Sequence, residues 1–142
     1  MILIVGAWYN EVGYSFEFSH KVDNYIREQI KEFVFPKYGL NKKDEDWYLR
    51  LIIATDSKTQ KTEVRGPDVK KRTKRVEFGL WLPHDVINKS TYPLETYIDC
   101  FFEALEIVFS NYNVPKEEIE TIKENCKKEI LHNPEYVFVP EF

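Results

Sequence analysis

The chain has 142 residues, of which 43% are apolar and 15% aromatic, and its formal net charge at pH 7 is -4. This composition is typical of a folded globular protein and excludes a disordered tail, and the length fits one domain over residues 1–142. The acidic total charge argues against a nucleic-acid-binding domain, because such domains usually carry a basic total.

The charge is distributed unevenly along the chain. Residues 56–82 carry 8 basic and 4 acidic side chains, a balance of +4, whereas residues 83–142 carry 5 basic and 12 acidic side chains, a balance of -7. A basic middle and an acidic C-terminal part are more informative about partners than the total charge.

The first residues, 1–5, form an apolar run. The run is too short for a membrane span or for a signal peptide, and it predicts a first strand over residues 2–7. Without an export signal we expect a cytoplasmic protein in which Cys100 and Cys126 are free thiols. Tyr14, Phe16 and Phe18 alternate with polar residues, a pattern that would suit a short second strand paired back on the first.

A helix and two strands follow. Apolar residues from Val22 to Phe33 have the 3.6-residue period of a helix, which ends before Pro36. Residues 47–55 are rich in β-branched and aromatic side chains and predict a strand. Residues 59–64 predict a short edge strand, and Gly66, Pro67 and Asp68 predict a break in the chain.

Side chains alternate along the next predicted strand, residues 72–82. One set faces the core and consists of Lys74, Val76, Phe78, Leu80 and Leu82. The other set, which includes Glu77, Gly79 and Trp81, faces solvent or a partner. With the two preceding strands, this strand predicts a three-stranded meander.

The chain is organised around a central helix over residues 94–109, in which apolar side chains recur at helical spacing. The set that faces the core comprises Leu94, Tyr97, Ile98, Phe101, Phe102, Leu105, Val108 and Phe109. The remaining Glu95, Asp99, Glu103 and Glu106 place four carboxylates in one row on the opposite face. Like charges at this spacing repel by a few tenths of a kcal/mol per pair. The carboxylate row therefore costs some stability and has no obvious structural use, which favours a binding surface.

A third helix begins after Pro115 and carries a narrow apolar stripe of Ile119, Ile122, Cys126 and Ile130. Residues 136–139 predict a last edge strand or a docked tail. The fold class is α+β: a mostly antiparallel sheet of four or five strands with three helices, the last two an antiparallel pair packed on one face. The other face of the sheet stays free to meet a partner.

Catalytic motifs are not recognisable in the sequence, and we expect neither an enzyme nor a cofactor. None of the three histidines has a second His or Cys at metal-ligand spacing, which argues against a metal site. His84 and Asp85 follow a predicted strand and are the enzyme candidate. The alternative is that Asp85 caps a turn and His84 is solvated. The carboxylate row raises the pKa of the Cys100 thiol, which disfavours a nucleophile.

A basic segment over residues 58–75 contains Lys58, Lys61, Arg65, Lys70, Lys71, Arg72, Lys74 and Arg75. Such a patch can bind a phosphate backbone, with Trp81 or Tyr48 stacking a base. The alternative is an edge hairpin whose lysines prevent aggregation between sheets. The acidic total charge favours the edge hairpin.

The acidic helix residues also have two interpretations. A solvated helix face is the commonest explanation of a charge run. The other is a face matched to a basic partner, because opposite potentials speed encounter and select the partner. Glu117, Glu120 and Glu124 on the third helix would broaden this face if the two polar faces adjoin.

The chain resembles the small cytoplasmic immunity proteins that bacteria encode beside polymorphic toxins. The resemblance covers the second half of the chain and rests on size, on the α+β order, on residues 75–83 and on the two helices that follow. Gly79, Leu80 and Trp81 resemble the G-x-W element of several such families.

The resemblance implies a protein without catalytic residues that binds a cognate toxin and blocks its active or substrate-binding site. Many of those toxins are nucleases with basic surfaces, which would suit the acidic helices, with Trp81 as a further contact or as plain sheet packing. The basic segment departs from this pattern and leaves open which face binds. We expect no membrane contact. A nucleic-acid-binding module that uses residues 58–75, an enzyme that uses His84 and Asp85, and a homodimer stay open alternatives.

Overall fold

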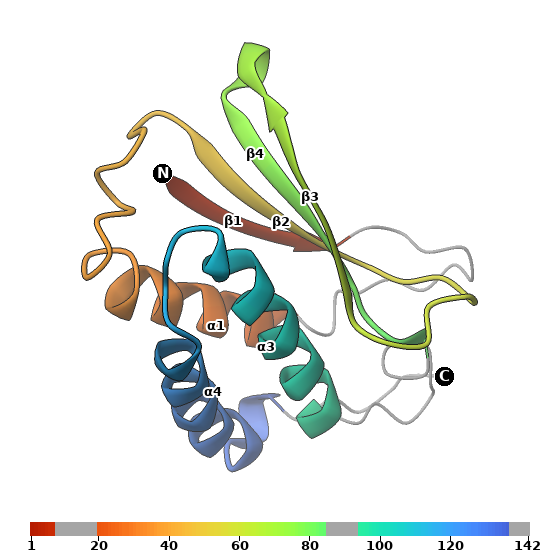
Figure 1. Cartoon of the computed structure of the whole chain (residues 1–142). Coiled ribbons are helices and arrows are strands. Elements are labelled where there is room, and N and C mark those ends of the chain that lie inside the picture. The colour runs from red at the N-terminus through yellow and green to blue at the C-terminus, as the bar shows by residue number, and fades with distance from the viewer. Residues whose placement is uncertain (8–19, 85–93, 137–142) are drawn as a thin grey trace.

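Figure 1 shows a computed structural model of the chain, which describes residues 1–7, 20–84 and 94–136. Its elements are β1 (Ile2–Ala7), α1 (His20–Phe33), β2 (Tyr48–Ala54), β3 (Glu63–Lys70), β4 (Arg75–Trp81), α3 (Leu94–Ser110) and α4 (Lys116–Leu131). Two short 3-10 helices accompany them, η2 (Lys71–Thr73) between β3 and β4 and η3 (Pro134–Tyr136) after α4.

The described strands form one mixed sheet in the order β1-β2-β4-β3. β1 pairs with β2 and β2 pairs with β4 in parallel, and β3 pairs with β4 antiparallel. The α+β class is confirmed, but the expected mostly antiparallel sheet is wrong. Helix α1 is the crossover connection that parallel pairing of β1 and β2 requires. The predicted meander is also wrong, because β3 takes the outer edge and β4 returns between β3 and β2.

Strand β3 continues through Gly66, Pro67 and Asp68, so the predicted break is wrong. The register against β4 shifts between Arg65 and Asp68, and the turn-forming residues make a β-bulge in place of a turn. An edge strand is a position where a sheet tolerates proline. A Cβ atom at Gly66 would lie 2.7 Å from the backbone oxygen of Glu77, which explains the glycine.

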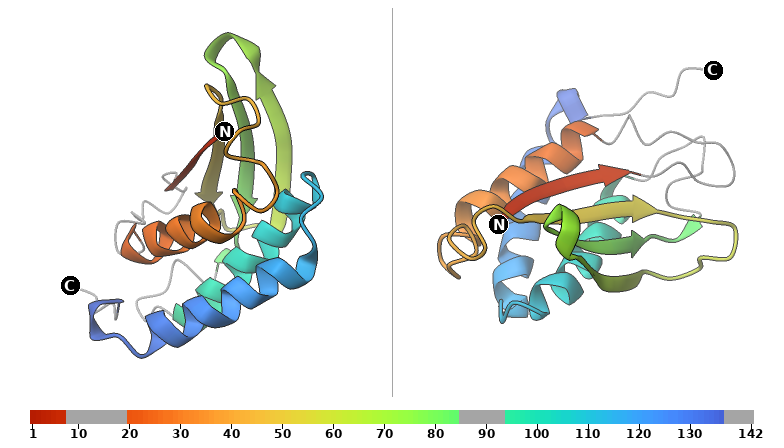
Figure 2. Two further views of the ribbon diagram at one scale, coloured as in Figure 1. Left: turned by 90° about the vertical axis from the view of Figure 1, so that its left-hand side faces the viewer. Right: turned by 90° about the horizontal axis from the view of Figure 1, so that it is seen from above.

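The three described helices lie on one face of the sheet (Figures 1 and 2). Helices α3 and α4 lie side by side and run in opposite directions, which confirms the predicted helix pair. Within the described residues no helix covers the opposite sheet face, which we call the helix-free face. It carries the side chains of β2 and β4 that point away from the core.

The core between sheet and helices uses the side chains that periodicity predicted. On α3 the buried set is Tyr97, Ile98, Phe101, Phe102, Ala104, Leu105, Val108 and Phe109. Phe78, Leu80 and Leu82 face this core from β4 and its end, and Ile119, Ile122, Cys126 and Ile130 face it from α4. Phe33 and Lys74 are exceptions. Phe33 at the end of α1 is 52% exposed, and Lys74, which alternation assigned to the core-facing set, is exposed and pairs with Asp46.

Two predicted elements lie outside the described residues. The short strand around Tyr14, Phe16 and Phe18 belongs to residues 8–19, and the last edge strand belongs mostly to residues 137–142. Tyr136, which the structure describes, ends η3 and packs edge-on against Tyr25 of α1, with ring centres 5.8 Å apart.

Candidate functional site

The N-terminal half of the predicted carboxylate row on α3 is tied to α4. Lys127 donates a hydrogen bond of 2.8 Å to Asp99 Oδ1 and forms an ion pair of 3.2 Å with Glu95. The hydrogen bond with Asp99 is the main reason that the pKa of Lys127 is raised. The first two carboxylates therefore have a structural use that the sequence did not reveal, because Lys127 lies 28 residues from Asp99 in the chain.

The C-terminal half of the row meets acidic residues of α4. Burial raises the pKa of Glu106, and the nearby carboxylates of Glu120 and Glu103 raise it further, against the opposing effect of Lys116 and Lys123. Lys116 itself forms an ion pair of 3.6 Å with Glu120. The polar faces of α3 and α4 therefore adjoin, which is the condition that the sequence hypothesis of a broad acidic surface required.

The three remaining carboxylates, Glu103, Glu117 and Glu124, are exposed. None of the three forms an ion pair with a side chain that the structure describes. Because Glu95 and Asp99 are paired and Glu106 and Glu120 lie beside lysines, these three carry the unmatched charge. We call Glu103, Glu117 and Glu124, together with Glu106 and Glu120, the acidic helix surface.

Trp81, the remaining predicted contact residue, lies on the helix-free face of the sheet. The guanidinium carbon of Arg65 stands 4.0 Å from the centre of the Trp81 ring, a stacked cation–π contact between neighbouring strands. The sheet therefore separates Trp81 from the acidic helix surface, and the two cannot form one continuous contact area.

The basic segment divides between this face and the hairpin tip. Arg65, Lys70 and Arg75 belong to the helix-free face, while Lys71 and Arg72 form η2 at the tip. Lys74 pairs with Asp46. Lys58 and Lys61 lie exposed in the connection that leads into β3.

Glu77 is the centre of the charged cluster on the helix-free face. Only 7% of the residue is exposed, although its position in β4 predicted contact with solvent or a partner. Its carboxylate oxygens lie 3.6 Å from Arg50, 3.3 Å from Lys70 and 3.6 Å from Arg75. Oε1 accepts no hydrogen bond from a described residue. Sequence reasoning missed this cluster because its members come from three strands.

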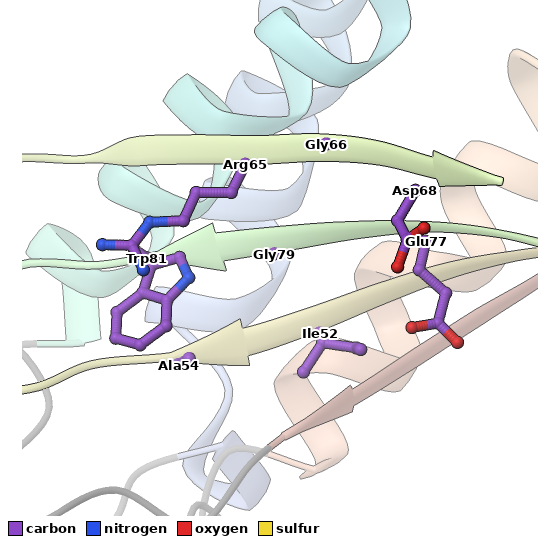
Figure 3. Close-up of a pocket in the computed structure, with 8 residues that line it drawn as sticks. All are labelled: Ile52, Ala54, Arg65, Gly66, Asp68, Glu77, Gly79 and Trp81. Atoms are coloured by element: carbon purple, nitrogen blue, oxygen red, sulfur yellow. The ribbon is translucent and has the colours of Figure 1, made fainter.

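A hollow of about 280 Å³ lies beside this cluster (Figure 3). Its lining consists of Ile52, Ala54, Arg65, Gly66, Asp68, Glu77, Gly79 and Trp81. The hollow therefore combines an aromatic end, an apolar floor and a charged end on a single sheet face.

The enzyme candidate is only partly described. His84 is half-buried and lines a second hollow with Ser57, Thr59, Gln60 and Pro83, whereas Asp85 lies outside the described residues. The backbone N–H of His84 donates to the carbonyl oxygen of Thr59 at 2.9 Å. The sequence did not single out Ser57 because it precedes His84 by 27 residues in a separate loop.

Both cysteines are free thiols. Burial raises the pKa of the Cys126 thiol to about 12 and also raises that of Cys100, to which Glu103 and Asp99 contribute. These thiols stay protonated near neutral pH and serve as packing groups. Across residues 1–7, 20–84 and 94–136, side chains of His, Cys, Asp and Glu form no group of three or more placed to hold a metal ion.

Helices in the described part of the chain are all too short or too polar to span a bilayer. Comparison with known proteins found no protein-family model, no curated protein and no solved structure that matches the chain.

Proposed function

We propose that this chain is a bacterial immunity protein that binds a basic toxin domain through the acidic helix surface and blocks the toxin's active or substrate-binding site. The proposal rests on the family resemblance in the second half of the chain and on one structural observation. Burial is the main cause of the raised pKa of Glu106 on α3, and the nearby carboxylate of Glu120 on α4 raises it further, so acidic residues of both helices share one surface.

The charge pattern favours recognition of a basic partner. Glu103, Glu117 and Glu124 are exposed, so their charge is available to a partner. A surface of one sign attracts a partner of opposite sign at long range and can raise the association rate by one to three orders of magnitude. Inhibition then follows from occupancy, because a nuclease whose basic cleft is covered cannot reach its nucleic acid.

The proposal is tested by co-expression with the toxic C-terminal domain of a secreted protein encoded in the neighbouring reading frame. We expect this chain to restore growth and to co-purify with that domain. The double variant Glu103→Lys/Glu124→Lys should lose protection, because it reverses two charges of the acidic helix surface. It should keep its fold, because neither residue forms an ion pair with a described side chain. Asp99 is unsuitable for the test, since a lysine there would face Lys127.

Glu32→Lys on α1 is the matched control, because it reverses an exposed carboxylate away from the acidic helix surface. It should protect as well as the original chain. Full protection by the double variant, with a circular dichroism spectrum like that of the original chain, would exclude the acidic helix surface as the binding site.

A further inference from the structure

The hollow on the helix-free face follows from the strand register. Glu77, Gly79 and Trp81 alternate along β4 and point to the same face. Gly79 has no side chain, and Ile52 of β2 lies directly beside it. The result is a gap, bounded by the Glu77 carboxylate at one end and by the Trp81 indole at the other (Figure 3).

The aromatic end depends on this glycine. A Cβ atom at Gly79 would lie 3.1 Å from Trp81 Nε1, so a residue with a side chain would require the indole to shift by a few tenths of an ångström. Arg65 covers the indole from β3. An indole beside a guanidinium plane is the kind of surface on which nucleic-acid bases stack.

The charged end is basic overall. Three cations, Arg50, Lys70 and Arg75, surround the carboxylate of Glu77, and Asp68, which also lines the hollow, pairs with Lys70 at 4.0 Å, so the five formal charges leave an excess of +1. A cationic ligand is disfavoured because the Glu77 charge is already shared by three partners. An anion is favoured, and Lys71 and Arg72 extend the positive potential to the hairpin tip.

We propose that the helix-free face binds single-stranded nucleic acid, with one base in the hollow against Trp81 and Arg65 and with the backbone phosphates along Arg75, Lys70 and the hairpin tip. This site is separate from the acidic helix surface and goes beyond the proposed immunity function. It gives a function to the basic segment, which the proposed immunity function does not explain.

The size of the basic strip favours a strand over a free nucleotide. The seven residues of β4 cover roughly 20 Å between Trp81 and Arg75. A mononucleotide carries its base and phosphate on one sugar and would leave the tip cations unused. A duplex would present its bases stacked and paired, so none could enter the hollow.

The test is a fluorescence anisotropy titration of the full chain with a labelled single-stranded oligonucleotide of mixed sequence. Trp81→Leu keeps apolar bulk but removes the aromatic face, and we expect it to weaken binding by roughly 5- to 150-fold, the effect of one lost base stack. Trp81→Phe should retain most of the affinity. Unchanged binding by Trp81→Leu, or no binding by the original chain, would overturn the proposal.

The salt dependence tests the phosphate contacts separately. In Arg75→Gln the slope of log affinity against log salt should become shallower by about 0.7, the contribution of one phosphate contact on a single strand. Lys128→Gln on α4 is the matched control and should leave the slope unchanged.

Two further tests use competing ligands and the double variant on α3 and α4. Equal competition by a duplex or by a mononucleotide would contradict the assignment to a single strand. Glu103→Lys/Glu124→Lys should still bind the oligonucleotide, so failure of either proposal is recognised independently of the other. Loss of oligonucleotide binding in this double variant would show that the two faces are not separate sites.

Discussion

The two charged regions of the molecule are built in opposite ways. Between α3 and α4, one cation, Lys127, is shared by two carboxylates. On the sheet, one carboxylate, Glu77, is shared by three cations. In both regions the ion pairs connect neighbouring elements, and the unmatched charge is what each surface offers to a partner.

The total charge of -4 therefore says little about which kind of partner each surface binds. The helical layer and the helix-free face have opposite signs, and the sheet lies between them. A partner therefore meets only one of the two, and each region can be changed without altering the charge of the other.

The largest expected effect concerns the core that both regions share. Phe101 is fully buried, and Phe101→Ala should lower the free energy of unfolding by about 3–5 kcal/mol, the cost of a large cavity. Ile107→Ala is the control on the same helix, because Ile107 is 45% exposed and should change stability by less than about 0.5 kcal/mol. Urea denaturation measures both. Similar midpoints would mean that α3 does not hold the two layers together.

Glu77→Gln tests the sheet cluster. Removing the charge leaves three cations facing one another, and we expect a loss of about 1–2 kcal/mol, between the values for exposed and buried ion pairs. The loss should shrink as salt is added, because salt screens the repulsion. A variant as stable as the original chain at low salt would show that Glu77 does not organise the cluster.

Lys127→Gln tests the ion pairs that connect α4 to α3. Two carboxylates lose a shared partner, and the expected loss is about 0.5–1 kcal/mol because Glu95 and Asp99 keep contact with water. Lys128→Gln, an exposed neighbour, should have almost no effect. If the two variants have the same melting temperature, the ion pairs of Lys127 contribute nothing to stability.

Glu106→Gln gives the smallest effect, which is seen in the pH dependence. Burial raises the pKa of this carboxyl above its ordinary value of 4.5, so the folded protein holds the proton more tightly than the unfolded chain does. The contribution of Glu106 to stability is therefore largest at low pH and is lost as the pH rises through about 4.5 and above. Relative to the original chain, Glu106→Gln should become more stable as the pH rises through 4.5 and above. Melting curves that shift in parallel would contradict this.

Local patterns predicted the core, because a helix or strand places its side chains with a fixed period. The buried face of α3 and the inward residues of β4 follow directly from that period. Strand order does not follow from it, since pairing of β2 with β4 is decided by contacts between residues 27 positions apart in the chain. The bulge at Gly66 illustrates the same limit, because turn-forming residues can also be accommodated at a sheet edge.

The candidate sites depend on such distant contacts even more strongly. Alternation in β4 correctly placed Glu77 on the helix-free face. Its burial follows from the three side chains that surround it, Arg50, Lys70 and Arg75. The carboxylate row on α3 was readable from spacing. Its neutralisation by Lys127 was not, because that contact depends on how α4 packs against α3.

The proposed recognition of a basic toxin domain is tested most directly by stopped-flow measurement of the association rate between this chain and that proposed partner at several salt concentrations. We predict a fast rate that falls as salt rises for the original chain, and a slower rate with a weaker salt dependence for Glu103→Lys/Glu124→Lys. Equal rates and equal salt dependence for the two chains would contradict recognition through the acidic helix surface.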